Sequence, residues 1–252
     1  MSQPTMPAPL GSIREVGILH SEQRSLSSAV SEQQYEIAIW LPESYSSSTK
    51  AYPAIYLLDS NMLFGAAVSL LLPLTWGTPP ELPECLIVGI GYKIKTYDDW
   101  LQRRTQNFFA GAPQFLSFIR SELIPFVDGN YRTDPTNRCL YGHSGGGWFV
   151  WHTLFHEPEL FKRYVAGSPG MGSEVTAWEQ AFADRRGDLP ARLAVVVGAL
   201  EIDQVTAIRD FCERLKHRQY TGFDVKLMVM EAADHATVIP QQMMRGLPTV
   251  FA

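Results

Sequence analysis

A serine and several histidines are the side chains of this sequence best suited to covalent chemistry. Ser144 stands in Gly142-His143-Ser144-Gly145-Gly146, which fits the Gly-x-Ser-x-Gly pattern of a nucleophile elbow, a sharp turn from a strand into a helix. The flanking glycines lack Cβ atoms, so the strand and the helix can approach closely and the serine can adopt a strained backbone. A serine hydroxyl is a weak nucleophile at neutral pH. It therefore needs a neighbouring base to take its proton.

Six histidines are candidates for that base: His20, His143, His152, His156, His217 and His235. We favour His235, because it follows the last predicted strand and the base comes last in chain order when the nucleophile lies on such an elbow. His143 is the variable residue of the elbow and should point away from the face from which the serine attacks. His152 and His156 have the i, i+4 spacing of zinc ligands, but they lack the glutamate of His-Glu-x-x-His and any obvious third ligand. We expect no metal.

Two carboxylates compete to orient His235. Glu201 and Asp203 both follow the predicted strand 193–197, where the acid of such a site is expected. Glu201 has the longer side chain, while Asp203 lies near the start of a helix and has its own explanation as an N-cap. Asp234 is the immediate neighbour of the base and is badly placed to accept from its Nδ1–H. Glu201 is the favoured acid, and Asp203 is the alternative.

Strands alternate with helices along the chain. An alternating segment at 14–28 should pair antiparallel with a strand at 35–41. Apolar or alternating runs then predict further strands at 53–58, 86–90, 137–141, 164–166, 193–197 and 225–230. Helices are expected at 63–72, 113–127, 177–185 and 205–218, after the elbow and at the C-terminus. The segment 93–112 reads as a loop. This order predicts a mostly parallel sheet with helices on both faces and right-handed crossovers, without a separate lid domain.

Composition narrows the classes of function. The 252 residues are 46% hydrophobic, which is enough for a sizeable core, and we expect a single domain with a flexible N-terminal tail at about 1–11. The net charge of −5 and the lack of a basic stripe exclude nucleic acid as an expected partner. No apolar run reaches the roughly 18 residues that span a bilayer, and no signal peptide is evident. We therefore expect a cytoplasmic protein without a membrane partner.

At this point the sequence resembles a known family. Its motifs are similar to those of the α/β-hydrolase superfamily, and within it to the putative-esterase branch, which includes esterase D, siderophore esterases, feruloyl esterases and mycolyltransferases. The matching pieces cover nearly the whole chain in the right order: Ile55-Tyr56-Leu57-Leu58-Asp59, Val88-Gly89-Ile90-Gly91-Tyr92, Glu122-Leu123-Ile124-Pro125, Asn130-Tyr131-Arg132, Gly142-His143-Ser144-Gly145-Gly146-Gly147, Pro158-x-Leu160-Phe161, Ser168-Pro169 and Asp234-His235.

The resemblance implies hydrolysis of carboxylic esters through an acyl-enzyme on Ser144, without a cofactor. It also implies an oxyanion hole formed by the backbone N–H groups of Gly145 and Asn61. The position of Glu201, three residues past a glycine, matches the acid of the resembling enzymes. Two residues depart from the pattern, because Gly145 stands where the family often has leucine and Ser60 stands where it usually has glycine.

The substrate is expected to be a small-molecule ester, bound in an open pocket between the segment 93–112 and the segment 171–178. Trp100, Arg104 and Trp178 are candidate contacts, with the tryptophans suited to an apolar or aromatic group and Arg104 to a carboxylate. Two other functions stay open: an acyltransferase of the same fold, and a catalytically silent module that only binds. The intact nucleophile, base and acid argue against the silent module, because binding alone does not need them.

Overall fold

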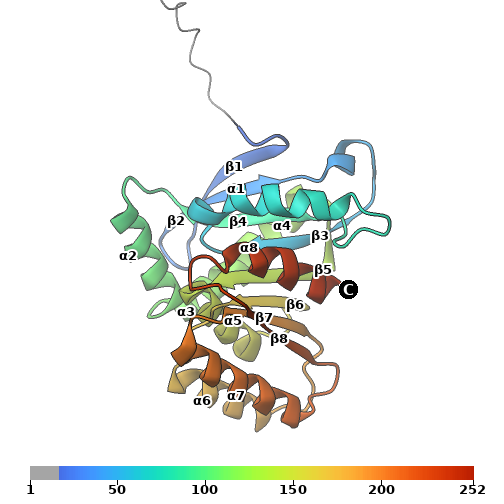
Figure 1. The fold of residues 1–252 in the computed structure, drawn as a ribbon. Coiled ribbons are helices and arrows are strands. Elements are labelled where there is room, and N and C mark those ends of the chain that lie inside the picture. Colours follow the sequence, from blue (N-terminus) through green and yellow to red (C-terminus); the bar gives the residue numbers. More distant parts are fainter. Residues whose placement is uncertain (1–16) are drawn as a thin grey trace, which may run out of the picture.

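The computed structural model describes residues 17–252, and these are built around one eight-stranded sheet (Figure 1). The strand order is β1-β2-β4-β3-β5-β6-β7-β8. The strand β2 is antiparallel to both of its neighbours, and every other neighbouring pair is parallel, which confirms the predicted mostly parallel sheet. The strands are β1 (Ser21–Ser27), β2 (Gln34–Trp40), β3 (Tyr52–Leu57), β4 (Leu86–Tyr92), β5 (Thr133–His143), β6 (Arg163–Gly167), β7 (Arg192–Gly198) and β8 (Asp224–Met230). The expected tail at 1–11 and the start of the first predicted strand lie outside the described residues.

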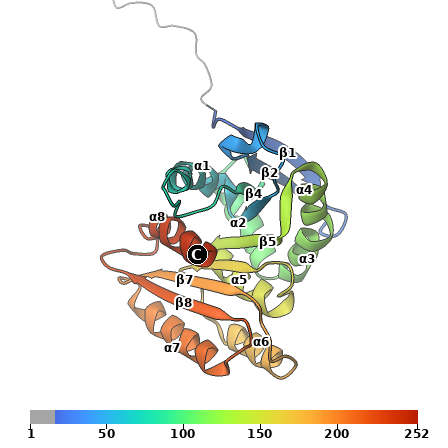
Figure 2. The ribbon, with the colours of Figure 1, turned by 90° about the vertical axis from the view of Figure 1, so that its right-hand side faces the viewer.

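The central strands are apolar along their whole length because helices cover both faces of the sheet. On one face lie α1 (Ser60–Leu71) and the C-terminal segments α8 (Ile239–Gln241), η4 (Gln242–Gly246) and α9 (Leu247–Phe251). The other face carries α3 (Ala112–Phe118), α4 (Ile124–Asn130), α5 (Gly145–His156), α6 (Ser173–Ala183) and α7 (Ile202–Arg218). Figure 2 shows α1 and α8 on one side of the strands and α3 and α5 on the other. The predicted covering of both faces is confirmed.

The prediction of a loop at 93–112 is wrong, because most of this segment forms the helix α2 (Tyr97–Phe108). A capping box starts the helix: Thr96 Oγ1 accepts from the Asp99 N–H at 3.1 Å, and the Asp99 carboxylate accepts from the Thr96 N–H at 3.2 Å. Only a narrow stripe of α2 is buried, with Trp100 and Phe108 as its apolar members. The segment looked like a loop because the rest of the helix is polar.

Two other predicted helices extend beyond the expected bounds. The first, α1, begins at Ser60, three residues before the apolar run that predicted it. The helix expected at 113–127 runs through α3, a π-helical turn η3 (Ile119–Leu123) and α4. Both differences lie at polar or irregular helix ends, where apolar periodicity carries little information.

A buried carboxylate joins α6 to α7. Glu179 is fully buried, and its oxygens accept from Arg214 Nε at 2.7 Å, from Arg218 Nε at 2.7 Å and from the Tyr220 hydroxyl at 2.6 Å. Burial by itself would raise the pKa of Glu179, but the bonds from Arg218, Tyr220 and Arg214 outweigh it and hold this pKa below its ordinary value. The ionised carboxylate therefore stabilises the fold.

We predict that Glu179→Gln lowers the free energy of unfolding by about 2–3 kcal/mol at pH 7, because hydrogen bonds to a charged group are lost. A depressed pKa contributes stability that is present above the unfolded-state value and is lost as the pH falls through the folded-state value. The difference between wild type and variant should therefore shrink below about pH 4.5. Urea unfolding at pH 7 and pH 4 measures both effects.

The matched control is Glu213→Gln on α7, which removes an exposed ion pair with Lys216 and should leave the free energy of unfolding nearly unchanged. Equal effects of the two substitutions, or a difference that does not depend on pH, would contradict the stabilising role of the Glu179 cluster.

Candidate active site

The candidate residues come together at the carboxyl edge of the sheet, which is where α/β sheets of this kind bind their ligands. Asp59 follows β3, Ser144 follows β5, Glu201 follows β7 and His235 follows β8. Ser144 and His235 line the same cavity of about 480 Å³. The remaining wall is mostly apolar and includes side chains from α1 and α2, together with Ala236 and Ile239 after β8.

The elbow at Ser144 has the expected strained turn. Its backbone adopts φ 58° and ψ −120°, a conformation that side-chain-bearing residues rarely take. A Cβ atom on Gly142 would lie 2.3 Å from the carbonyl oxygen of Gly146, so only glycine allows β5 and α5 to meet this closely. The Ser144 N–H donates to the carbonyl of Gly167 on β6 at 2.8 Å. The turn is therefore fixed by the hydrogen bond to β6 and by the close packing of Gly142 on β5 against Gly146 on α5.

Glu201 is the carboxylate that meets the candidate base. His235 Nδ1 donates to Glu201 Oε2 at 2.6 Å, while Glu201 Oε1 accepts from the Ser168 hydroxyl at 2.6 Å and from the Gly198 N–H at 2.8 Å. Burial raises the pKa of Glu201, but the bonds from Ser168, His235 and Gly198 together keep that pKa below its ordinary value. Because the ionised Glu201 carboxylate can only accept, the proton of neutral His235 lies on Nδ1, and the lone pair that can accept a proton lies on Nε2.

The two other carboxylates make different contacts. Asp203 lies in the first turn of α7 with an exposed side chain, and its expected role as the N-cap is wrong, because Glu201 occupies the N-cap position. The Asp234 carboxylate accepts from the N–H groups of Ala236 and Thr237 and thereby stabilises its own loop. Within residues 17–252, Glu201 is thus the carboxylate that forms an ion pair with His235.

The base and the nucleophile are close without direct contact. Among the described residues, no hydrogen bond joins the Ser144 hydroxyl to His235, whose side chain is 45% exposed. Catalytic hydrogen bonds in ligand-free enzymes are often long and tighten only when substrate binds. The arrangement fits a site in which the substrate completes the alignment.

The candidate contact Arg104 is already paired. Its guanidinium makes two hydrogen bonds of 2.9 Å to the Asp59 carboxylate, and both side chains are buried. Arg104 also stacks over Trp100 and Phe108 of its own helix. Arg104 lines the same cavity as Ser144, and its pair with Asp59 anchors α2 beside the elbow. Its contact with a substrate carboxylate stays a prediction.

This pairing accounts for one departure from the family pattern. A Cβ atom on Gly145 would lie 3.1 Å from the ring of Phe109 and 3.4 Å from the guanidinium of Arg104. A side chain at position 145 would therefore press on the Phe109 ring, which would have to shift by a few tenths of an ångström. Glycine at this position therefore makes room for the end of α2.

Of the two candidate tryptophans, one lines the cavity beside Ser144 and the other does not. Trp100 lines the cavity, and its contact with substrate stays a prediction. Trp178 does not reach it, because its ring packs edge-on against Trp148 and against His152 and His156 on the far part of α5. The segment 171–178 consequently does not wall this cavity, whereas α2 does. Trp178 is not among the side chains that line the cavity beside Ser144, because it is packed on the aromatic row of α5, and its contact with substrate has no support from this cavity.

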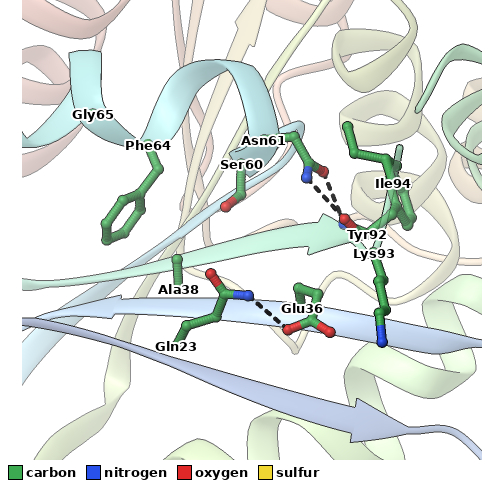
Figure 3. Close-up of a pocket in the computed structure, with 10 residues that line it drawn as sticks. All are labelled: Gln23, Glu36, Ala38, Ser60, Asn61, Phe64, Gly65, Tyr92, Lys93 and Ile94. Carbon is green, nitrogen blue, oxygen red and sulfur yellow. Dashed lines mark hydrogen bonds between the residues drawn. The ribbon is translucent and has the colours of Figure 1, made fainter. Parts of the chain in front are cut away.

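Asn61 belongs to the first turn of α1, and its side chain fastens that turn to β4. The amide nitrogen donates to the Tyr92 carbonyl at 2.8 Å, and the amide oxygen accepts from the Tyr92 N–H at 2.8 Å (Figure 3). Asn61 also lines a second cavity of about 530 Å³, where Gln23 donates to Glu36. This clamp fixes the backbone at Asn61, while the oxyanion role of Asn61 and Gly145 stays a prediction.

The expectation that His143 points away from the site is wrong. Its ring lies 4.7 Å from that of His235, centroid to centroid, and it lines the same cavity. Two further residues near it escaped the sequence reasoning: Ser168, which appeared only as part of a Ser-Pro motif, and Gln242, which carries no local signal. Each binds across the sheet edge to a partner far away in the chain.

The structure also bears on metal binding and on membrane-spanning helices. No group of three or more histidine, cysteine, aspartate or glutamate side chains within 17–252 is arranged to hold a metal ion. In the same range no helix has both the length and the apolar character needed to cross a membrane.

Comparisons with known proteins identify the family of this chain. Residues 27–209 match the putative esterase family. The ferri-bacillibactin esterase BesA of Bacillus subtilis is 27% identical over 264 residues, covering 90% of this chain and 88% of that protein. A siderophore enterobactin esterase of Emericella nidulans is 31% identical over 164 residues, or 54% of each chain.

Solved structures show the same fold. The BES protein from Bacillus cereus superposes with a TM-score of 0.87 at 24% identity, covering 96% of this chain and 99% of that one. The enterobactin and salmochelin hydrolase IroE superposes with a TM-score of 0.74 at 22% identity, covering 93% and 96%.

The strand order and the elbow thus define an α/β-hydrolase fold, as the sequence predicted. The chain belongs to the putative esterase family. Its predicted class, a carboxylic ester hydrolase, is confirmed.

We predict that Glu201→Gln lowers kcat for a simple ester by about 10³- to 10⁴-fold, because the neutral amide no longer holds His235 in the correct tautomer or stabilises its charged form. Asp203→Asn, made as the matched control, should leave kcat near the wild-type value. Steady-state kinetics on both variants, with melting temperatures to confirm equal folding, decide between the two acids. Loss of kcat in Asp203→Asn with little change in Glu201→Gln would reverse the assignment.

Proposed function

We propose that this chain is a serine esterase in which Ser144 attacks the ester carbonyl, His235 moves the proton and Glu201 orients His235. The observation that carries the proposal is the contact of 2.6 Å between His235 Nδ1 and Glu201 Oε2 beside the strained Ser144, at a single cavity. These are the nucleophile, base and acid that ester hydrolysis requires.

Each step uses a group that this chain holds in place. His235 Nε2 takes the hydroxyl proton of Ser144 as the serine oxygen bonds to the carbonyl carbon. The same imidazolium then gives the proton to the departing alkoxide, which leaves as an alcohol, and the acyl group stays on Ser144. A water molecule then gives a proton to His235 as its oxygen bonds to the acyl carbon. The bond from the acyl carbon to Ser144 breaks, His235 returns the proton to the serine oxygen, and the acid leaves.

Stabilisation of the negative charge on the carbonyl oxygen is assigned to the N–H groups of Gly145 and Asn61. Both belong to the first turns of helices, where backbone N–H groups have no partner within the helix and favour negative charge. The Asn61 side chain bonds to Tyr92 on both sides of its amide, which supports a fixed position for its own backbone. Preorganised donors of this type contribute about 3–4 kcal/mol of transition-state stabilisation each.

We propose siderophore esters as the natural substrate class. The support comes from two sides: the relatives named above carry siderophores in their names, and the cavity beside Ser144 is open and mostly apolar. Its exposed apolar side chains include Met62, Tyr97 and Leu101, which suit an aromatic or otherwise apolar substituent close to the ester.

We predict that a catecholate trilactone and short aryl esters are hydrolysed with higher kcat/KM than long-chain triglycerides, and that Ser144→Ala abolishes hydrolysis of all of them. Liquid chromatography of the products, with and without an added alcohol acceptor, also separates the hydrolase from an acyltransferase. A preference for triglyceride with interfacial activation would contradict the substrate class. Transfer of the acyl group to the alcohol in preference to water would contradict hydrolysis. If no ester were turned over, the chain would instead be the catalytically silent module that only binds.

A further inference from the structure

A chain of hydrogen bonds runs beneath the candidate active site and passes through Gln242. This residue is fully buried at the start of η4. Its Oε1 lies 3.1 Å from His143 Nδ1 and accepts from the Tyr141 hydroxyl at 3.0 Å. Its Nε2 donates to the Ser168 hydroxyl at 3.2 Å. Gln242 thereby touches both the strand that carries Ser144 and the turn that supports Glu201.

The direction of every bond in this chain is fixed by the groups at its ends. The ionised Glu201 carboxylate only accepts, so the single proton of the Ser168 hydroxyl points at Glu201 Oε1. Ser168 must then accept from the Gln242 amide. A flipped amide would place Oε1 against the hydroxyl oxygen of Ser168 and near the Val196 carbonyl, which now lies 3.5 Å from Nε2. The amide orientation is therefore determined.

The same reasoning sets the tautomer of His143. Because Gln242 Oε1 cannot donate, the proton of His143 lies on Nδ1. Burial lowers the pKa of His143 to about 4, and the nearby His235 lowers it as well, so the ring is neutral at pH 7. A neutral ring can lie 4.7 Å from His235 without repelling the charge that His235 acquires during proton transfer.

The backbone is shaped to accommodate this side chain. A Cβ atom on Gly167 would lie 2.1 Å from Gln242 Oε1, so only glycine at this position leaves room for the amide. The next residue, Ser168, is fully buried and has a positive φ of 39°, which is unusual for a residue other than glycine. Strain of this kind persists where the surrounding structure imposes it.

We propose that Gln242 is a positioning residue for ester hydrolysis: through the Ser168 hydroxyl it orients Glu201, and through His143 it supports the ring of His235. The proposal rests on the proposed function, in which Glu201 and His235 act together on Ser144. Gln242 itself does not touch the substrate cavity, so it acts through its neighbours. Losing it allows the Ser168 hydroxyl to rotate away from Glu201.

The test is a double-mutant cycle with Gln242→Met, which keeps the length of the side chain and removes its hydrogen bonds, and Ser168→Ala. Each single variant should lower kcat for an aryl ester by about 10- to 100-fold with KM nearly unchanged, because misplaced catalytic groups slow the chemical step without weakening binding. The double variant should be no slower than the slower single variant, since both substitutions break the same chain of bonds. Gln241→Met, at the exposed neighbouring position, is the matched control and should match wild type.

A proton NMR spectrum supplies a second readout. The proton between His235 and Glu201 should give a low-field signal in wild type and in Gln241→Met, and this signal should weaken or vanish in Gln242→Met and in Ser168→Ala. If Gln242→Met does not fold, judged by circular dichroism, Gln242→Asn, whose shorter amide cannot reach Ser168 and His143 together, carries the kinetic and the spectroscopic test.

Three results would overturn the proposal: unchanged kcat, a loss confined to KM, or effects that multiply in the double variant. These outcomes presuppose an active wild-type enzyme. An inactive wild type would instead mean that the proposed function has failed, so the two failures are distinguishable.

Discussion

The contact between Gly142 and Gly146 is the constraint on which the site depends. The missing Cβ at position 142 lets the backbone of α5 approach the end of β5, where a methyl group would lie 2.3 Å from a carbonyl oxygen. That approach fixes Ser144 at a positive φ, which costs on the order of 1–3 kcal/mol for a residue with a side chain. The bond from the Ser144 N–H to Gly167 stabilises the turn from the neighbouring strand. The position of the nucleophile is thus set by backbone contacts.

The acid is controlled differently, by hydrogen bonds that gather on one carboxylate. Glu201 accepts from a hydroxyl, a backbone N–H and an imidazole, and its side chain is only 5% exposed. A buried carboxylate needs such partners to remain ionised. His235, by contrast, is largely accessible from the cavity, which suits a group that exchanges protons with substrate and water. The pair thus combines a fixed, buried anion with an accessible base.

Local patterns carried most of the sequence predictions. The strands β3, β4 and β7 are continuous apolar runs, so their positions and the polar ends that follow them could be read directly. Ser144 and His235 stood out because glycines or a strand end flanked them. In contrast, α2 was missed because its face is polar and its cap, the Thr96–Asp99 box, is a short signal. Trp178 was misplaced because sequence does not reveal which side of α5 its helix packs against.

The remaining features depend on contacts between distant residues. Asp59 meets Arg104 only because α2 folds back over the elbow, and Gln242 meets Ser168 and His143 only because the C-terminal segment crosses the sheet. No spacing rule in the sequence encodes these pairs. They could be recognised only when the packing of the helices was known.

Covalent capture of the nucleophile tests the central claim most directly. The purified protein is incubated with a fluorophosphonate, digested and analysed by mass spectrometry, with Ser144→Ala and the exposed-site variant Gln241→Met treated alongside. The account predicts one modified residue, Ser144, in wild type and in Gln241→Met, and no modification in Ser144→Ala. Equal labelling of Ser144→Ala, or no labelling of the folded wild-type protein, would contradict it.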